Sequence, residues 1–135
     1  MGNPLVETSD EFREFWTERR VCLLGTVSPD GTPHVVAVGV TVDFESGLAR
    51  VIASRTSKKI RNVLAHGEIG ARASVTGHDG RRRWSTLQGL AHVRVDRESV
   101  GEAERRYALR YREPRENPQR AVLEIAIDQL LGSVR

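Results

Sequence analysis

The sequence is poor in several residues that would define its chemistry at once. Only one cysteine, Cys22, occurs in 135 residues, which excludes an internal disulfide. Because no histidine or other cysteine lies near it at metal-ligand spacing, a structural zinc site is excluded as well. No apolar run approaches the roughly 18 residues of a membrane span, and the N-terminus lacks a basic segment followed by an apolar one. These absences predict a cytoplasmic protein that binds neither a membrane nor a metal ion.

Side chains arranged for catalysis are also sparse. The four histidines, His34, His66, His78 and His92, are dispersed, no Ser-His-Asp order stands out, and no paired carboxylates lie close in sequence. We therefore predict no catalytic side chain, and if the chain is an enzyme, its chemistry belongs to a bound cofactor. Aromatic residues make up only 5% of the chain and no RNA- or DNA-binding motif is visible, so a non-enzymatic nucleic-acid binder ranks last.

The composition is that of a globular domain with polarised charge. Hydrophobic residues make up 39% and charged residues 29%, and the length suffices for one domain but not two, so we predict a single domain over residues 1–135. Residues 50–83 carry a net charge of +7 although the whole chain carries +3, which leaves −4 elsewhere. The basic side chains of this segment are Arg50, Arg55, Lys58, Lys59, Arg61, Arg72, Arg81, Arg82 and Arg83. We expect them to face an anionic ligand, the alternative being a solvated surface.

Hydrophobic periodicity and turn signals predict a mainly β protein with short helices. Three helices are expected over residues 9–19, 58–66 and 99–111, the first of them opened by a capping box. Six strands are expected over residues 21–27, 34–42, 48–53, 69–76, 83–95 and 121–131, the first three as an antiparallel meander. Because strands joined as hairpins cannot form a parallel doubly wound sheet, we predict a small closed or partly closed β-barrel.

The passage from the third expected strand into the second expected helix has the composition of a phosphate site. Free backbone N–H groups and the positive end of the helix dipole collect at such a point. Here they are joined by short hydroxyl donors and by cations, namely Ser54, Arg55, Thr56, Ser57, Lys58, Lys59 and Arg61. The order of a Walker loop is missing, so triphosphate hydrolysis is not predicted. The alternative is that Ser57 merely caps the helix and the lysines are solvated.

A second basic cluster, residues 81–83, precedes Trp84 at the start of an expected strand. A tryptophan beside several guanidinium groups offers a stacking surface for a planar ring or an acid-rich tail, although a core position is the alternative. His34 begins another strand and is expected either to be structural or to face a cofactor.

Several motifs in this chain are those of one family. They are Pro33-His34-Val35-Val36-Ala37-Val38-Gly39, the pair Lys59 and Asn62, Arg83-Trp84 with Gly89, the run from Glu104 through Tyr107, Arg110-Tyr111-Arg112 and Pro114 to Arg120, and Leu131-Gly132-Ser133. With them the sequence resembles the flavin and deazaflavin oxidoreductase superfamily of split β-barrel fold, which is related to pyridoxamine 5′-phosphate oxidase. Within it, the sequence is most similar to the branch of coenzyme F420-dependent biliverdin reductases, over roughly residues 20–133.

The resemblance implies a six-stranded split barrel that forms a homodimer, with the cofactor in a groove at the subunit interface. The implied cofactor is coenzyme F420, with FMN as the alternative. By this mapping Ser57 and Lys59 hold the phosphate, and Asn62 braces the turn. Residues 34–36, which are His34, Val35 and Val36, line the ring, partly through backbone contacts. Candidates for the oligoglutamate tail of F420 are Arg55, Lys58 and Arg61.

The resemblance also implies a reaction, in which reduced F420 gives a hydride to the central methine carbon of biliverdin and bilirubin forms. The propionates of that tetrapyrrole need cationic partners, for which Arg83, Arg110 and Arg112 are the candidates. The alternative within the same fold is an FMN-dependent oxidase or flavin reductase.

Overall fold

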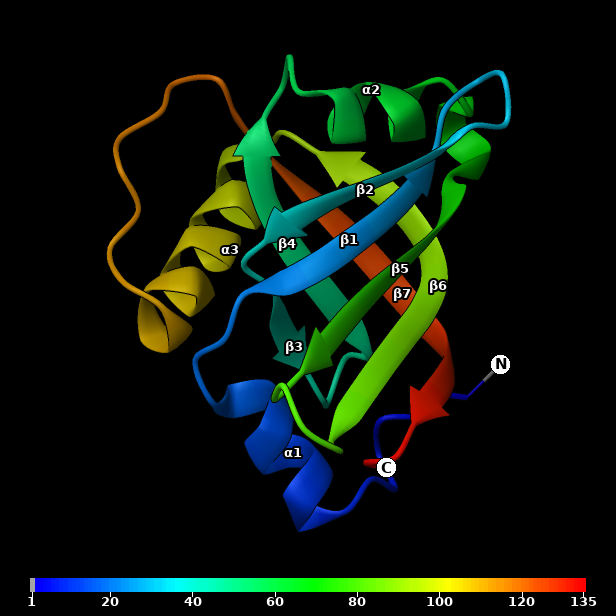
Figure 1. Cartoon of the computed structure of the whole chain (residues 1–135). Helices are drawn as coiled ribbons and strands as arrows, with labels where there is room; N and C mark the ends of the chain where they lie inside the picture. The colour runs from blue at the N-terminus through cyan, green and yellow to red at the C-terminus, as the bar shows by residue number, and fades with distance from the viewer. Residues whose placement is uncertain (1) are drawn as a thin grey trace.

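The computed structural model describes residues 2–135, which form one antiparallel β-sheet with three α-helices and a 3-10 helix (Figure 1). The helices are α1 (Asp10–Thr17), α2 (Lys58–Leu64) and α3 (Arg97–Arg110), with the 3-10 helix η1 at Gly67–Ile69. The strands are β1 (Cys22–Val27), β2 (Pro33–Val38), β3 (Thr41–Asp43), β4 (Leu48–Ser54), β5 (Ala71–His78), β6 (Trp84–Arg94) and β7 (Arg120–Gly132). The predicted mainly β class is confirmed.

The sheet has seven strands where the sequence analysis predicts six. Its order is β2-β1-β5-β6-β7-β4-β3, so the two edge strands, β2 and β3, follow one another in the chain. The predicted strand 34–42 is in fact both of them, interrupted at Gly39 and Val40. The expected hairpins β1–β2 and β3–β4 are present, but β4 pairs with β7 rather than with β2, so the predicted meander is wrong. The result is a barrel that remains split between its edge strands.

The interruption is held by the end of α3. The hydroxyl of Tyr111 accepts a hydrogen bond from the Val40 N–H at 3.0 Å and donates one to the Arg20 carbonyl at 2.8 Å. Arg110 donates from Nη1 to the Val40 carbonyl at 2.5 Å and from Nε and Nη2 to the Glu18 carbonyl at 3.0 and 2.7 Å. The backbone groups of Val40, fully buried outside any strand, are thereby satisfied. Arg110 is 9% exposed and fully engaged, so its predicted role in substrate binding is corrected to a structural one.

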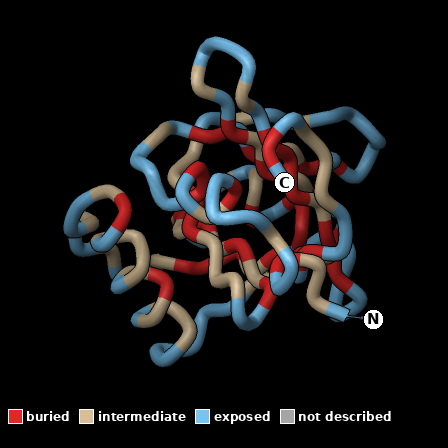
Figure 2. Tube along the Cα trace, turned by 90° about the horizontal axis from the view of Figure 1, so that it is seen from below, coloured by how far each residue is buried: buried red, intermediate tan, exposed pale blue. Residues whose placement is uncertain are grey.

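The core fills the inside of the curled sheet, with exposed residues gathered along the loops (Figure 2). Helix α1 covers one end, because its predicted aromatic face, Phe12, Phe15 and Trp16, is buried. Ser9 caps this helix as expected, accepting from the Phe12 N–H at 3.1 Å. The Trp16 indole donates to the Ser85 hydroxyl at 2.9 Å, which satisfies two buried polar groups. Burial of these three aromatic side chains thus holds α1 against the end of the barrel.

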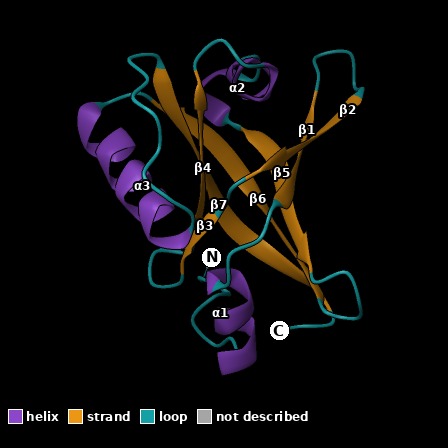
Figure 3. Ribbon diagram, turned by 60° about the vertical axis from the view of Figure 1, so that its left-hand side comes forward, coloured by secondary structure: helices purple, strands orange, loops and turns teal. Residues whose placement is uncertain are grey.

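The three helices occupy different sides of the barrel. Helix α2 lies at one end and α1 at the other, while α3 lies alongside (Figure 3). The β5–β6 hairpin turns at the α1 end, far from α2 (Figure 1). Among residues 2–135, no helix is both long and apolar enough to cross a membrane.

Candidate functional site

The turn from β4 into α2 differs from its prediction in one respect. The Ser57 hydroxyl donates to the Ser54 carbonyl at 2.8 Å and makes no cap bond to α2, so the predicted capping role of this side chain is wrong. Within the described residues, the backbone N–H groups of Lys58 and Lys59 have no hydrogen-bond acceptor. Lys58 is exposed, whereas Lys59 is half-buried. The turn therefore keeps free donors and places one lysine inward.

This turn is joined to the proline-rich loop that follows α3. Asn117 donates from its side-chain amide to the Ser54 hydroxyl at 2.9 Å, and the Arg55 N–H donates to the Gln119 carbonyl at 2.8 Å. The pairing of β4 with β7 continues up to Ser54 opposite Arg120. Two segments that each carry motifs of the family resemblance are thus brought side by side, through contacts between residues 63 or more positions apart in the sequence.

Between these segments and the edge of β2 lies a cleft of about 380 Å³, here called the basic cleft. Its lining residues are Ala37, Val38, Gly39, Ile52, Lys59, Tyr107, Arg112, Glu113, Pro114, Arg115 and Arg120. Arg120 is held by Glu104 at 3.0 Å and by the Arg115 carbonyl. Lys59, Arg112 and Arg115 form no ion pair with any residue from 2 to 135. Three unpaired cations against one carboxylate, that of Glu113, make this cleft suitable for an anion.

The wall of the cleft at Ala37–Gly39 belongs to an open sheet edge. Over the described chain β2 pairs with β1 alone, so the backbone groups along its other side have no strand partner. Such an edge offers N–H donors and carbonyl acceptors in a row. A flat heterocycle that carries both donors and acceptors fits this edge, with its anionic substituents directed at the cations.

The predicted ring-lining residues 34–36 lie next to this wall rather than in it. Val36 packs against the core, and His34 lies on the same inner face of β2, where its Nδ1 is buried without a hydrogen-bond partner in the described chain. Val35 points outward and is 60% exposed. The structure places Ala37–Gly39 at the basic cleft instead, three residues further along the chain than the resemblance implies.

Asn62 connects α2 to the barrel. It is 3% exposed and donates to the Thr26 hydroxyl at 3.1 Å, and its carbonyl contacts the ring of His66 at 3.0 Å. The bond between Asn62 and Thr26 fixes α2 against β1, and with it the direction in which Lys59 points. A brace at this position is the role that the resemblance implies for Asn62.

The remaining predicted cations are dispersed. Arg55 is exposed and lines a neighbouring outer cleft of about 700 Å³ together with Arg97 and Arg115. Lys58 and Arg61 are exposed on α2. Of the three predicted tail cations, only Arg55 lines this outer cleft, and Lys58 and Arg61 line neither cleft.

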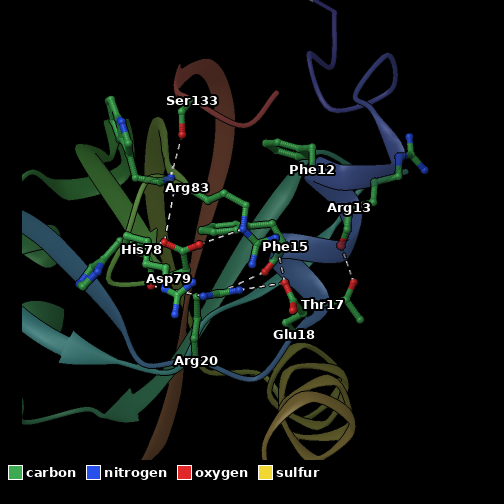
Figure 4. A network of polar contacts seen from close by, with 12 residues as sticks. Phe12, Arg13, Phe15, Thr17, Glu18, Arg20, His78, Asp79, Arg83 and Ser133 are labelled. Atoms are coloured by element: carbon green, nitrogen blue, oxygen red, sulfur yellow. Dashed lines mark hydrogen bonds and ion pairs between the residues drawn. The ribbon is translucent and has the colours of Figure 1, made fainter.

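Trp84 and Arg83 lie at the opposite end of the barrel from α2. Arg83 donates from Nε to Asp79 at 3.0 Å and contacts Glu18 at 3.4 Å, and its guanidinium lies 5.4 Å from the Phe15 ring centre (Figure 4). Trp84 is 44% exposed, which rules out the core alternative. Neither residue lines the basic cleft of its own chain, so within one chain the structure does not support the predicted stacking role of Trp84 or the predicted substrate contact of Arg83.

Burial changes the acidity of two groups beside the split. It raises the pKa of the Tyr111 hydroxyl and that of the Cys22 thiol, and in both cases desolvation is the main cause. Both groups stay protonated at neutral pH, so Tyr111 remains a hydrogen-bond donor to the Arg20 carbonyl. Among residues 2–135, no three His, Cys, Asp or Glu side chains gather as a metal ion would require.

Residue-by-residue reasoning missed most of the cleft's cations. Arg115 and Arg120 lie in the segment 104–120, whose six arginines are interspersed with three glutamates, so the basic residues do not form an uninterrupted cluster. The family resemblance includes residues 104–120 among its motifs, and so it points to this segment. It implies a role only for Arg110 and Arg112, however. Tyr107 was likewise part of the quoted motif without an assigned role.

Comparisons with known proteins show the family and the fold of the chain. An F420H2-dependent biliverdin reductase of Mycobacterium tuberculosis is 42% identical over 133 residues, covering 98% of this chain and 93% of that protein. A conserved hypothetical protein of Mycobacterium tuberculosis has a solved structure with a TM-score of 0.75 at 21% identity, covering 98% of this chain and 88% of the other. A structure named F420 reductase gives 0.68 at 22% identity, covering 91% and 98%. Residues 8–133 match the pyridoxamine 5′-phosphate oxidase family, and the chain belongs to it.

Proposed function

We propose that this protein is an F420H2-dependent reductase that converts biliverdin to bilirubin. The observation that carries the proposal is the basic cleft along the open edge of β2, in a chain 42% identical over nearly its whole length to a reductase of that name. The structural relatives support the fold, and the cleft supports an anionic, planar ligand.

The residues present fit coenzyme F420. Lys59 and the free N–H groups at the start of α2 suit its phosphodiester, and the open edge at Ala37–Gly39 suits its deazaflavin ring. The outer cleft adjoins the basic cleft through Arg115, and Arg55 and Arg97 line it. An oligoglutamate tail needs more positive charge than FMN does. These arginines are its candidate partners, although Glu104, Glu113 and Glu116 line the same outer cleft.

When bound, reduced F420 supplies a hydride. The chain's own contribution is to hold the two reactants in contact and to neutralise their carboxylates and phosphate. Among the described residues, no histidine lines the basic cleft, and its one carboxylate, Glu113, is exposed. The proton that accompanies the hydride therefore comes from water in this proposal.

A homodimer completes the proposal. The outer face of β1 and β2 exposes apolar side chains that a monomer would leave in water, namely Leu23, Val27 and Val35. A second copy packed there would bury them and would cover the ring edge. A cytoplasmic location and the absence of nucleic-acid and membrane partners stay predictions from the sequence.

The test is a spectrum and a turnover assay. The purified protein should bind F420, quench its fluorescence, and oxidise F420H2 when biliverdin is added, with bilirubin appearing in equal amount. Protein that purifies yellow with bound FMN and consumes oxygen would favour the FMN-dependent alternative. Absence of turnover with saturating enzyme, despite F420 binding, would remove biliverdin as the substrate.

A further inference from the structure

A second cleft adjoins the basic cleft on the side away from Lys59. It measures about 640 Å³ and is here called the tyrosine cleft. Its lining residues are Arg19, Arg20, Val21, Ala37, Val38, Gly39, Tyr107, Tyr111 and Arg112. The residues that it shares with the basic cleft are Ala37–Gly39, Tyr107 and Arg112. A molecule in the tyrosine cleft therefore lies next to whatever occupies the basic cleft.

The aromatic wall of this cleft is rigid. The rings of Tyr107 and Tyr111 are stacked, with centroids 4.9 Å apart and an interplanar angle of 29°. They lie directly on Gly39, where a Cβ atom would stand 2.8 Å from Tyr107 Cε2 and 3.1 Å from Tyr111 Cε2. The Tyr111 hydroxyl is further held by Val40 and by the Arg20 carbonyl. The wall thus offers a fixed π-surface to a flat conjugated molecule.

Three arginines line the tyrosine cleft, and two of them, Arg19 and Arg112, have no ion-pair partner in the described chain. Arg20 is paired with Glu18 at 3.0 Å and lies 4.1 Å from the Phe15 ring centre. Arg19 and Arg112 are exposed and form no ion pair or side-chain hydrogen bond with any residue from 2 to 135. Two free guanidinium groups, on segments that follow α1 and α3, flank the aromatic wall. They match a ligand with two separated carboxylates.

Resting on the proposed function, we propose that the tyrosine cleft is the substrate subsite, that it takes a flat conjugated dicarboxylate, and that Arg19 and Arg112 each bind one carboxylate. Arg112 belongs to both clefts, so the substrate's conjugated centre lies beside the cofactor's ring. Arg19 belongs to the tyrosine cleft alone, which makes it the residue that separates substrate binding from cofactor binding.

The test compares Arg19→Gln and Arg112→Gln with Arg82→Gln, a control at an exposed arginine without an ion-pair partner in the described chain. Biliverdin is titrated into the cofactor-free protein while tryptophan fluorescence is followed. Each cleft variant should raise the Kd by about five- to tenfold, and the control should leave it within about twofold. In turnover, Arg19→Gln should raise the KM for biliverdin and leave the KM for F420H2 unchanged.

A change in the ligand gives the second arm. Biliverdin dimethyl ester, which lacks the carboxylate charges, should bind the wild type more weakly than biliverdin does. The difference between acid and ester should disappear in the variant that lacks both arginines. If the ester binds as tightly as the acid, or if the cleft variants behave as Arg82→Gln does, this subsite is wrong even though turnover persists. A wild type that never oxidises F420H2 with biliverdin would instead refute the proposed function.

Discussion

Arginines gather both at the α1 end of the barrel and at the basic cleft, but they differ in whether acidic side chains pair with them. At the α1 end, Arg20 and Arg83 are neutralised by Glu18 and Asp79 (Figure 4). The Asp79 carboxylate also accepts from the Arg81 N–H, which together with Arg83 lowers its pKa. At the split, no acid of the described chain forms an ion pair with Lys59, Arg112 or Arg115, and Glu113 is the one carboxylate that lines the basic cleft with them. The α1 end also carries the exposed Arg81 and Arg82, which form no ion pair in the described chain. An unpaired arginine therefore indicates binding only where it lines a cleft, as Arg112 and Arg115 do.

The strongest contrast is between two neighbouring arginines, Arg110 and Arg112. Arg110→Met should lower the free energy of unfolding by about 3 kcal/mol, because the buried carbonyl of Val40 and the part-buried carbonyl of Glu18 lose a charged donor. Arg112→Gln should change it by less than about 0.5 kcal/mol, since this side chain is exposed and unpaired in the described chain. Urea unfolding of both variants measures the difference, and equal losses would contradict the structural role of Arg110.

The next contrast is between two adjacent lysines. Lys59→Ala should weaken F420 binding by about 1.5 to 3 kcal/mol, which is the value of a hydrogen bond to a charged group. Lys58→Ala should weaken it by less than about 0.5 kcal/mol, because Lys58 is exposed outside the basic cleft. Fluorescence titration gives both affinities, and circular dichroism checks that the fold persists. Unchanged affinity in Lys59→Ala would remove Lys59 from the site.

Gly39 offers a test of the aromatic wall. Gly39→Ala should cost about 1 to 2 kcal/mol of stability, because the added methyl group stands 2.8 Å from the Tyr107 ring. In a Tyr107→Ala background the same substitution should cost less, since the crowded ring is gone. Additive losses in the double variant would show that the two residues do not meet.

Alkaline pH should act on the buried groups beside the split. Because burial raises the pKa of the Cys22 thiol above its ordinary 9.0, the unfolded chain loses that proton first. The stabilisation is complete below about pH 9 and is lost as the pH rises, by at most about 1.4 kcal/mol per pH unit for this group. Cys22→Ala should show a shallower decline of unfolding free energy between about pH 9 and 10. An identical slope in the variant would contradict the shift.

The smallest effect is expected at the neutralised cluster. Arg83→Gln should cost less than about 1 kcal/mol, because its ion pairs are partly exposed and screened by solvent. It should leave the affinities for F420 and biliverdin unchanged. A clear loss of biliverdin affinity in this variant would restore the role that the sequence resemblance implies for Arg83.

The sequence predicts local structure better than it predicts neighbours in space. The Ser9 cap, the aromatic face of α1 and the hairpin turns follow from patterns a few residues long, and all are present. The break at Val40 could not be predicted, because it depends on Arg110 and Tyr111, some seventy residues away. For the same reason the charge map did not distinguish the paired Arg83 from the unpaired Arg112.

The candidate site shows the same limit. The turn at 54–59 was found from its hydroxyls and cations, and the resemblance directed attention to β2. Its connection to the loop after α3 rests on one amide and one backbone bond, Asn117 to Ser54 and Arg55 to Gln119, which no sequence pattern encodes.

The seam left between β2 and β3 has one more consequence. Strands β2 and β3 are joined directly through Gly39 and Val40. They cannot move together to close the barrel unless the hydrogen bond between the Val40 N–H and the Tyr111 hydroxyl breaks. A ligand that lies along the open edge of β2 would take the place of a neighbouring strand. Ligand binding would then also supply the missing partner of the β2 edge. The bound protein should therefore be less mobile than the free protein at the residues that contact the ligand.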